Sequence, residues 1–415
     1  MLSVGVFVDL WWRPEAGGHV KCWEWYAKAA VALGDRLDLT LHFLGKRQQV
    51  VELSEQVRYV LHPPLFSTDC LPFLRGIADV TDLAPLNPKL FPYLRRYDVL
   101  HATHPLFVFG RTALHFSRRT GTPLVASIHT DVPKYTEIYT PQIIRRLLGQ
   151  RGLSRLLLDR WQIHRRQRQA MERQLEQYWP FCDRVIVSQP EDYEKVARVI
   201  PSERVSYLKR GIDSEQFHPR RRDREKLRQT YNIPPDKPLL LFVGRLDPCK
   251  RVSILAQAAR LLLDRGLPIH TCFVGKGNSA TEIQTLLGKN ATLTGIIPHT
   301  DLGWIYASAD LFVFPSDTET YGNVVVEAKA CGLPVIVSAR GGTAQQIRHP
   351  GRDGLVIAEN DPQSWAAAIA GLLQNPTALA TMGQAARQQI ESDWPSWQDV
   401  LEHDLLSVWQ SVNKP

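Results

Sequence analysis

Two glutamates near the C-terminal end of the chain have neighbours suited to binding a polar ligand. Glu319 and Glu327 are separated by seven residues that include the turn-forming sequence Tyr321-Gly322-Asn323. A short apolar run before Glu319 is typical of a strand, and the run after the turn is typical of a helix that ends at a glycine. The start of such a helix favours an anion such as a diphosphate, and flanking carboxylates accept hydrogen bonds from sugar hydroxyls. The alternative is two solvated glutamates at a helix start.

Two cations follow another apolar run. Arg245 and Lys250 come after the predicted strand Leu239 to Val243. Arginine offers a planar fork to phosphate oxygens and lysine offers a point charge, so both side chains could bind one diphosphate. The alternative is two surface cations after a strand.

These motifs resemble those of retaining glycosyltransferases with the GT-B architecture, in the large group called family four or glycosyl transferases group 1. That family carries a Glu-x7-Glu signature with an aromatic-glycine pair, followed by Gly-x-Pro-Val. Three further segments resemble its glycine loop, its interdomain connector and its Gly-Arg-Leu-x-x-x-Lys element: Pro14 to Gly18, Leu208 to Asp213, and Phe242 to Lys250. Five matches in the family's order over nearly the whole chain argue against chance agreement.

The resemblance implies a role for each matching residue. It assigns Glu319 to hydroxyls of the transferred sugar, as a catalytic residue, and Glu327 to the ribose hydroxyls. The other donor-binding residues that it implies are Arg245 and Lys250, Ile297 at the base, and Tyr321, Gly322 and Asn323, whose amides would hold phosphate. Since Arg245 and Lys250 would neutralise the departing diphosphate, we expect no metal and no cofactor. The donor would be a UDP-, GDP- or ADP-sugar. Lys276 departs from the pattern, because many relatives carry an acidic residue there.

The N-terminal half offers weaker candidates. Gly17 and Gly18 precede a helix predicted from about His19, where unhindered amides can approach the donor or an acceptor hydroxyl, although such a pair is often a plain turn. His129 ends the predicted strand Leu124 to Ile128. In relatives a histidine here contacts the donor sugar or helps to place the acceptor, so we assign His129 a catalytic role. A lone histidine is more often structural. His101 and His104, near another strand end, are lesser candidates.

Composition limits the class of protein. The chain has 415 residues, with 44% hydrophobic and 22% charged, and contains no run of 18 apolar residues. These values are typical of a globular protein and predict no membrane-spanning helix. Six scattered cysteines without a Cys-x-x-Cys pair indicate reduced thiols in a cytoplasmic protein. We expect the N-terminus to form a first buried strand rather than a signal peptide.

An arginine-rich segment suggests contact with a membrane. Between Arg145 and Arg173 there are nine arginines against only Asp159 and Glu172, and apolar or amphipathic residues from Leu153 to Tyr178 fall at the spacing of one helix face. A basic amphipathic helix suits an anionic membrane surface, and the arginines expected to make that contact are Arg151, Arg155, Arg165 and Arg166. A solvated face packed on its own domain is the alternative. A nucleic-acid groove is disfavoured, because known binding modules are absent.

Apolar strand-like runs alternate with helical stretches throughout, which predicts parallel sheets covered by helices. We predict an α/β protein of GT-B type, with two doubly wound Rossmann-like domains facing across a cleft. A polar, proline-rich linker is expected over residues 210–238. The predicted domains are an acceptor-side domain, a nucleotide-sugar domain and a C-terminal helix returning to the first domain: residues 1–215, 216–392 and 393–415.

The resulting hypothesis is a retaining, metal-independent enzyme on the cytoplasmic face of the membrane. It would move a hexose from a nucleotide-sugar to a lipid or lipid-linked acceptor and form an α-glycosidic bond. The segment from Ile128 to Tyr139 looks most like members that glycosylate lipids, including sulfoquinovosyl and mannosyl transferases. Three alternatives stay open: an exopolysaccharide or small-metabolite glycosyltransferase with a soluble acceptor, an inactive GT-B-like scaffold, and a nucleotide-sugar epimerase.

Overall fold

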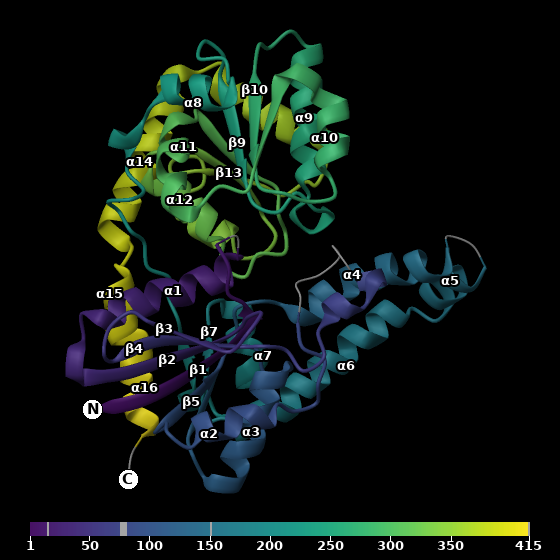
Figure 1. Cartoon of the computed structure of the whole chain (residues 1–415). Coiled ribbons are helices and arrows are strands. Elements are labelled where there is room, and N and C mark those ends of the chain that lie inside the picture. Colours follow the sequence, from purple (N-terminus) through teal and green to yellow (C-terminus); the bar gives the residue numbers. More distant parts are fainter. Residues whose placement is uncertain (15, 75–80, 150–151, 414–415) are drawn as a thin grey trace. The chain divides into compact units, whose positions relative to one another are not determined.

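The computed structural model describes residues 1–14, 16–74, 81–149 and 152–413 (Figure 1). The chain divides into two compact units, one of residues 1–211 with 397–415 and the other of residues 212–396. Each unit is an α/β structure around one largely parallel sheet, which confirms the predicted fold class. The chain passes between the units at 211–212 and 396–397, where the sequence had suggested boundaries at 215 and 392.

Unit 1 is built on an eight-stranded sheet with the order β3-β4-β2-β1-β5-β6-β7-β8. Its strands are β1 Leu2–Trp11, β2 Leu37–Leu44, β3 Gln49–Glu52, β4 Val57–His62, β5 Val99–Ala102, β6 Leu124–Ser127, β7 Arg184–Val187 and β8 Val205–Tyr207. Only the edge strand β3 pairs antiparallel. The central strands β5 and β6 are buried throughout, as their short apolar sequences predict for strands covered on both faces.

The helices of unit 1 include a segment from the C-terminal end of the chain. They are α1 Gly18–Val31, α2 Phe91–Leu94, α3 Val108–Thr120, α4 Val132–Leu148, α5 Leu153–Arg155, α6 Ile163–Tyr178, α7 Pro190–Ala197, α15 Trp397–Val400 and α16 Ser407–Val412. A π-helical segment, Leu401–Leu406, joins the last two. Leu401, Leu405 and Trp409 are fully or almost fully buried in the same apolar cluster as Trp23 of α1. Residues 397–412 therefore complete the core of unit 1.

Unit 2 is built on a six-stranded parallel sheet with the order β11-β10-β9-β12-β13-β14. Its strands are β9 Leu239–Val243, β10 His270–Val274, β11 Ala291–Gly295, β12 Leu311–Phe314, β13 Val335–Ser338 and β14 Leu355–Ile357. Its helices are α8 Arg224–Tyr231, α9 Val252–Asp264, α10 Ala280–Leu287, α11 Leu302–Ser308, α12 Asn323–Ala330, α13 Pro362–Leu373 and α14 Pro376–Asp393. In Figure 1, α9 and α10 lie on one side of the sheet and α11 and α12 on the other.

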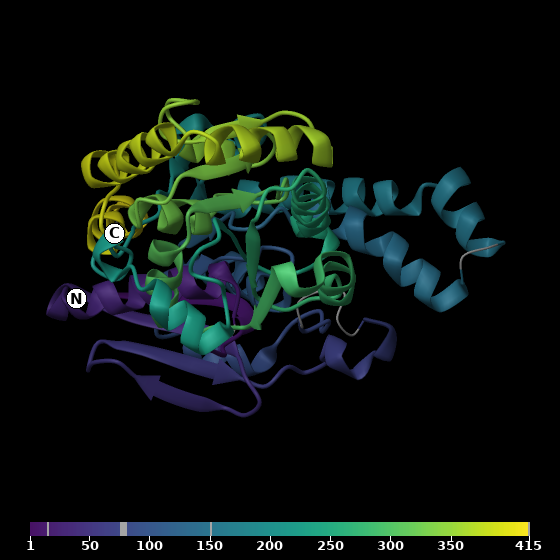
Figure 2. The same ribbon diagram turned by 90° about the horizontal axis from the view of Figure 1, so that it is seen from above.

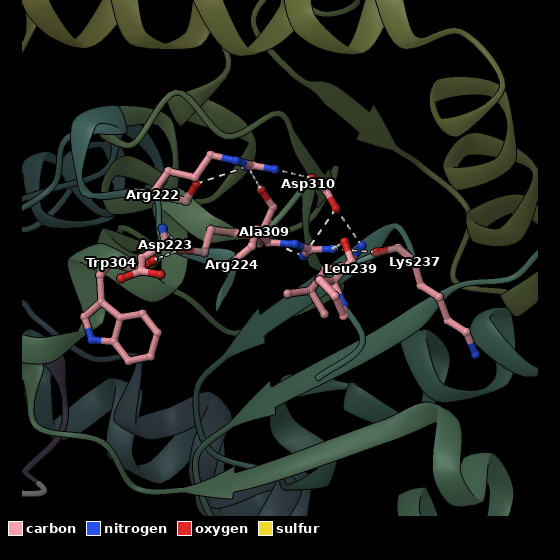
Figure 3. A network of polar contacts seen from close by, with 11 residues as sticks. Arg222, Asp223, Arg224, Lys237, Leu239, Trp304, Ala309 and Asp310 are labelled. Carbon is pink, nitrogen blue, oxygen red and sulfur yellow. Dashed lines mark hydrogen bonds and ion pairs between the residues drawn. The ribbon is translucent and has the colours of Figure 1, made fainter. Parts of the chain in front are cut away.

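Most of the expected linker over residues 210–238 is instead part of unit 2, which begins at residue 212. Its apolar residues Phe217, Leu227 and Ile233 are buried in the core of that unit. Polar contacts also hold this segment, and Figure 3 shows the network around Arg222 and Asp310. Arg222 donates to the carbonyls of Ala307 and Ala309, and its guanidinium pairs with Asp310 at 3.1 Å. These carbonyls lie at the C-terminal end of α11, where the last carbonyls of a helix lack partners within the helix, so Arg222 satisfies them while it holds this polar segment in unit 2.

The arginine-rich segment is a helical hairpin that belongs to unit 1. Helices α4 and α6 pack against each other, and Figures 1 and 2 both show them extending away from the sheet of their unit, with α5 at the far end. The side chain of Asp131 caps α4 by accepting from the amide of Lys134 at 3.0 Å. Because Asp131 lies two residues after His129, the same turn fixes the end of β6 and the start of the hairpin.

Candidate functional site

The predicted donor residues of unit 2 lie at the carboxyl edge of its sheet, where ligands of such folds bind. Arg245 and Lys250 follow β9, and Glu319 follows the neighbouring strand β12. The ammonium of Lys250 lies 2.5 Å from Oε1 of Glu319, and the two side chains are 11% and 21% exposed. Nε of Arg245 lies 3.3 Å from Oδ2 of Asp247. The structure therefore joins two of the candidates in a largely buried ion pair.

Glycines bring two loops of this edge into contact. Gly322 has a φ of +84°, and a Cβ there would lie 2.7 Å from Cγ2 of Thr343. Gly342 donates its amide to the carbonyl of Glu319 at 2.7 Å, and a Cβ on Gly342 would lie 2.3 Å from the carbonyl oxygen of Thr320. Both positions thus require glycine. The sequence analysis did not predict Gly342, although the pair Gly341-Gly342 follows a strand and could have indicated a close backbone contact.

Helix α12 begins directly after Gly322. This N-cap glycine provides no capping side chain, so none competes with an anion for the amides at the helix start. Tyr321 and Asn323, the other predicted phosphate neighbours, flank it and are partly buried. The carbonyl of Tyr321 accepts from the side-chain amide of Gln346 at 2.7 Å, which ties this turn to the loop after β13.

Glu327 is buried in the second turn of α12, at 6% exposure. Its Oε1 accepts from Nε2 of His299 at 2.8 Å, and its Oε2 accepts from the hydroxyl of Tyr306 at 3.0 Å. Burial and the adjacent Glu327 raise the pKa of Tyr306 well above its ordinary value, so the phenol stays a donor. A carboxylate has about four acceptor positions, so Glu327 retains capacity for ligand hydroxyls while two protein groups fix it. Sequence reasoning missed both supports.

The predicted base-binding segment follows β11. Ile297 is partly buried and packs against the core of unit 2, while Ile296 is 46% exposed. The exposed Lys276 lies beside this segment, because its Cε would be 3.5 Å from a Cβ on Gly295. The lysine that departs from the family pattern is therefore close to the segment assigned to the base.

In unit 1, His129 belongs to a buried network. Nη2 of Arg210 donates to Nδ1 of His129 at 2.6 Å, so the neutral ring carries its proton on Nε2, which lies 2.7 Å from Oγ of Ser127. His101 receives a hydrogen bond from Nε1 of Trp409 at 3.1 Å and contacts the same Ser127 oxygen at 2.8 Å. Burial, and then the neighbouring His19 and Arg210, hold the pKa of His129 well below its ordinary value. Both nitrogens of His129 are thus engaged.

The glycine loop lies next to this network. Gly17 and Gly18 are exposed at the start of α1, and a Cβ on Gly17 would meet nothing within 4 Å. The following residue, His19, stacks on His129 with ring centroids 4.3 Å apart and contacts the ring of His104 at 4.6 Å. The structure therefore brings the glycine loop, His104 and His129 together, with His19 between them.

Three of the four predicted membrane-contact arginines are described, and all three belong to the hairpin. Arg151 lies outside the described residues; Arg155, Arg165 and Arg166 are exposed, and Arg165 approaches Glu137 at 3.9 Å. Four large apolar side chains near the far end of the hairpin are also exposed, by 43–53%: Leu147, Leu148, Leu153 and Trp161. Sequence reasoning did not single out Leu147 and Leu148. In the described part of the chain, no helix is both long and apolar enough to cross a bilayer.

Comparison with known proteins identifies the family. The family described as "Glycosyl transferases group 1" matches residues 223–389, and "Glycosyltransferase Family 4" matches residues 16–216. The D-inositol 3-phosphate glycosyltransferase 1 of Catenulispora acidiphila is 30% identical over 339 residues, which cover 76% of this chain and 72% of that protein. The chain therefore belongs to the group 1 glycosyltransferases, as its motifs predicted.

Two further proteins are similar to this chain. Sulfoquinovosyl transferase SQD2 of Arabidopsis thaliana is 30% identical over 333 residues, or 78% of this chain and 60% of that protein. The solved structure of Anabaena HepE in complex with UDP-glucose matches with a TM-score of 0.67 and 18% identity, covering 99% of this chain and 100% of that one. That likeness shows the shared fold. The aligned regions span 60–66% of the first three curated relatives.

Proposed function

We propose that this chain transfers a hexose from a nucleotide-sugar, with retention and without a metal, to a lipid or lipid-linked acceptor at the cytoplasmic face of a membrane. The part of this proposal that concerns the nucleotide-sugar donor rests on the arrangement of residues around α12. A cation, Lys250, and an uncapped helix start supply positive potential for a diphosphate, while Glu319 and Glu327 supply hydroxyl acceptors. HepE binds UDP-glucose on the same fold, which favours a UDP-sugar.

The proposed reaction is a front-face displacement. The bond between the sugar C1 and the diphosphate oxygen breaks, and the acceptor oxygen forms its bond to C1 on the same face, which gives an α linkage from an α-linked donor. The acceptor proton passes to an oxygen of the leaving diphosphate. Arg245 and Lys250 would stabilise the charge on that group, and this is the role a metal ion has in other transferases.

Each remaining site residue has a place in the proposal. Glu319 would exchange its pairing with Lys250 for hydroxyls of the transferred sugar, because the diphosphate offers the ammonium a new anionic partner. Ile297 would pack on the base, and Glu327 would bind the ribose. In unit 1, Gly17 and Gly18 would let substrate approach the backbone closely. His129, fixed by Arg210 and Ser127, would help to place the acceptor.

The hairpin supports a lipid acceptor. Its end combines exposed leucines and Trp161 with exposed arginines, including Arg155, Arg165 and Arg166. Apolar side chains that insert at the interface, with arginines that attract anionic headgroups, are the two components of peripheral membrane binding. A solvated helix face would explain the arginines and leave the four exposed apolar side chains without a function.

A second candidate is transfer to a soluble acceptor, which the names of the D-inositol 3-phosphate glycosyltransferases favour. One experiment separates the two. The purified chain is incubated with radiolabelled UDP-glucose and either anionic liposomes made from a bacterial lipid extract or D-inositol 3-phosphate. We expect label in the organic phase with the liposomes. Label only in the aqueous product with inositol phosphate would favour the soluble acceptor.

A further inference from the structure

His19 is a partly buried side chain whose two ring nitrogens are both buried and have no hydrogen-bond partner among the described residues. Buried polar atoms are normally hydrogen-bonded, so an exception calls for an explanation. Among the described histidines, His164 and His270 each have one such nitrogen and His19 has two. Both hydrogen-bonding positions of this imidazole are therefore unused.

The position of His19 favours a ligand rather than a packing role. It is the second residue of α1 and follows Gly17 and Gly18, and a Cβ on Gly17 would meet nothing within 4 Å. Its ring stacks on His129, which holds it in place. His129 itself has both nitrogens occupied by Arg210 and Ser127. Of the two stacked rings, only His19 can accept a new hydrogen bond without breaking an existing one.

The chemistry of the ring identifies the class of ligand. Burial, and then the neighbouring His104 and Arg210, hold the pKa of His19 well below its ordinary value, so the ring is neutral. A neutral imidazole offers one N–H donor and one acceptor nitrogen, and a hydroxyl group offers the complementary pair. A cation is disfavoured by Arg210, whose guanidinium donates into the same cluster.

We propose that His19 binds a hydroxyl group of a transfer substrate, either the reacting hydroxyl of the acceptor or a hydroxyl of the transferred sugar. This inference rests on the proposed function and adds a residue to it. His19 would be the direct contact in unit 1, and His129 would be the ring that positions it.

The test compares His19→Phe with wild type. Phenylalanine preserves the stacked ring and removes the two unpartnered nitrogens. We expect kcat/KM for transfer to fall about 10- to 100-fold, the effect of one or two lost hydrogen bonds in a buried site, while Tm stays equal or rises. His19→Gln, which keeps a donor and an acceptor, should recover part of the activity. His115→Phe on α3 is the matched control and should retain wild-type activity and stability.

The outcomes separate the possible explanations. Hydrolysis of the UDP-sugar without acceptor should be unchanged if His19 binds the acceptor hydroxyl, and should fall in parallel with transfer if it binds the transferred sugar. Wild-type kcat/KM in His19→Phe would overturn the inference, as would a lowered Tm, since that marks a structural role. If wild type transfers from no nucleotide-sugar, the proposed function fails, and the Tm comparison alone then decides the role of His19.

Discussion

Replacing Glu327 with glutamine should weaken binding of the donor nucleotide while leaving unit 2 folded. The carboxylate is buried and is held by His299 at 2.8 Å and Tyr306 at 3.0 Å. A truncation to alanine would leave the buried Tyr306 hydroxyl unpaired, at about 1–3 kcal/mol, so lost folding would be confused with lost binding. Glutamine keeps one oxygen acceptor and nearly the same volume.

The magnitude follows from the number of charged hydrogen bonds that change. If the ribose hydroxyls donate to Glu327, the neutral amide converts charge-assisted bonds into weaker ones and can accept at only one atom. A hydrogen bond to a charged group contributes about 1.5–3 kcal/mol and a neutral one about 0.5–1.5 kcal/mol. The difference of roughly 1–2 kcal/mol corresponds to a Kd for UDP about 5- to 30-fold higher.

Isothermal titration calorimetry with UDP measures this directly. Tyr306→Phe is the control, because it removes one support of Glu327 and no proposed ligand contact, and its Kd should change less than that of Glu327→Gln. A Kd for UDP in Glu327→Gln equal to that of wild type would refute the assignment of Glu327 to the ribose.

Three other predictions concern metal, membrane and acid. Transfer should survive excess EDTA if, as proposed, Arg245 and Lys250 stabilise the leaving diphosphate in place of a metal ion. Turnover that is lost with EDTA and restored by Mg²⁺ or Mn²⁺ would contradict this. Binding to anionic liposomes should be salt-sensitive. Replacing the hairpin arginines with glutamine should weaken the free energy of liposome binding by about 1 kcal/mol for each arginine that contacts the surface, while UDP affinity is retained. Absence of binding at low salt would contradict the membrane contact. The free energy of unfolding should fall as pH drops below about 6.5, because burial lowers the pKa of His62 to about 4 and of His101 and His104 to about 3 in the folded chain. The unfolded chain therefore takes up these protons first, and each histidine lowers the free energy of unfolding by about 1.4 kcal/mol per pH unit. Urea midpoints that are flat between pH 6.5 and 4.5 would contradict this last reasoning.

Much of the fold could be predicted from the sequence because its central strands are short, apolar and buried on both faces. Strand β9 has the predicted bounds, Leu239 to Val243. The sequence analysis predicted no strand at β3, β4 or β11. β3 and β11 are edge strands, and β3 is mostly exposed while β11 is only partly buried, so their apolar patterns are weak. β4 is buried apart from Arg58, but the polar residues Arg58 and His62 interrupt its apolar pattern.

The sequence predicted candidate site residues only where they belong to one local motif. Glu319, Gly322 and Glu327 lie within one turn and helix, so their spacing identified them. The pairing of Glu319 with Lys250 joins residues 69 positions apart, and that of His129 with Arg210 joins residues 81 positions apart. No local spacing encodes these contacts. His299 and Tyr306 were missed for the same reason, because their function depends on Glu327.

The hairpin shows how tertiary packing limits a prediction from periodicity. The expected single apolar face over residues 153–178 divides in two. Tyr178 is buried and Leu175 packs against the core of unit 1, whereas Leu153 and Trp161 are exposed. Helical spacing predicted which residues share a face, and the packing of α6 on α4 and the sheet determined which of them remain accessible.

The central claim is that the carboxyl edge of unit 2 binds the diphosphate of a nucleotide-sugar. The most direct measurement is calorimetric titration of the wild-type chain and of Lys250→Ala with UDP, GDP and ADP, followed by their glucose conjugates. We expect saturable binding of one nucleotide, UDP, and a Kd at least about tenfold higher for Lys250→Ala, since a charged hydrogen bond to phosphate contributes roughly 1.5–3 kcal/mol. Failure of wild type to bind any of these ligands, or equal affinity in Lys250→Ala, would contradict the claim.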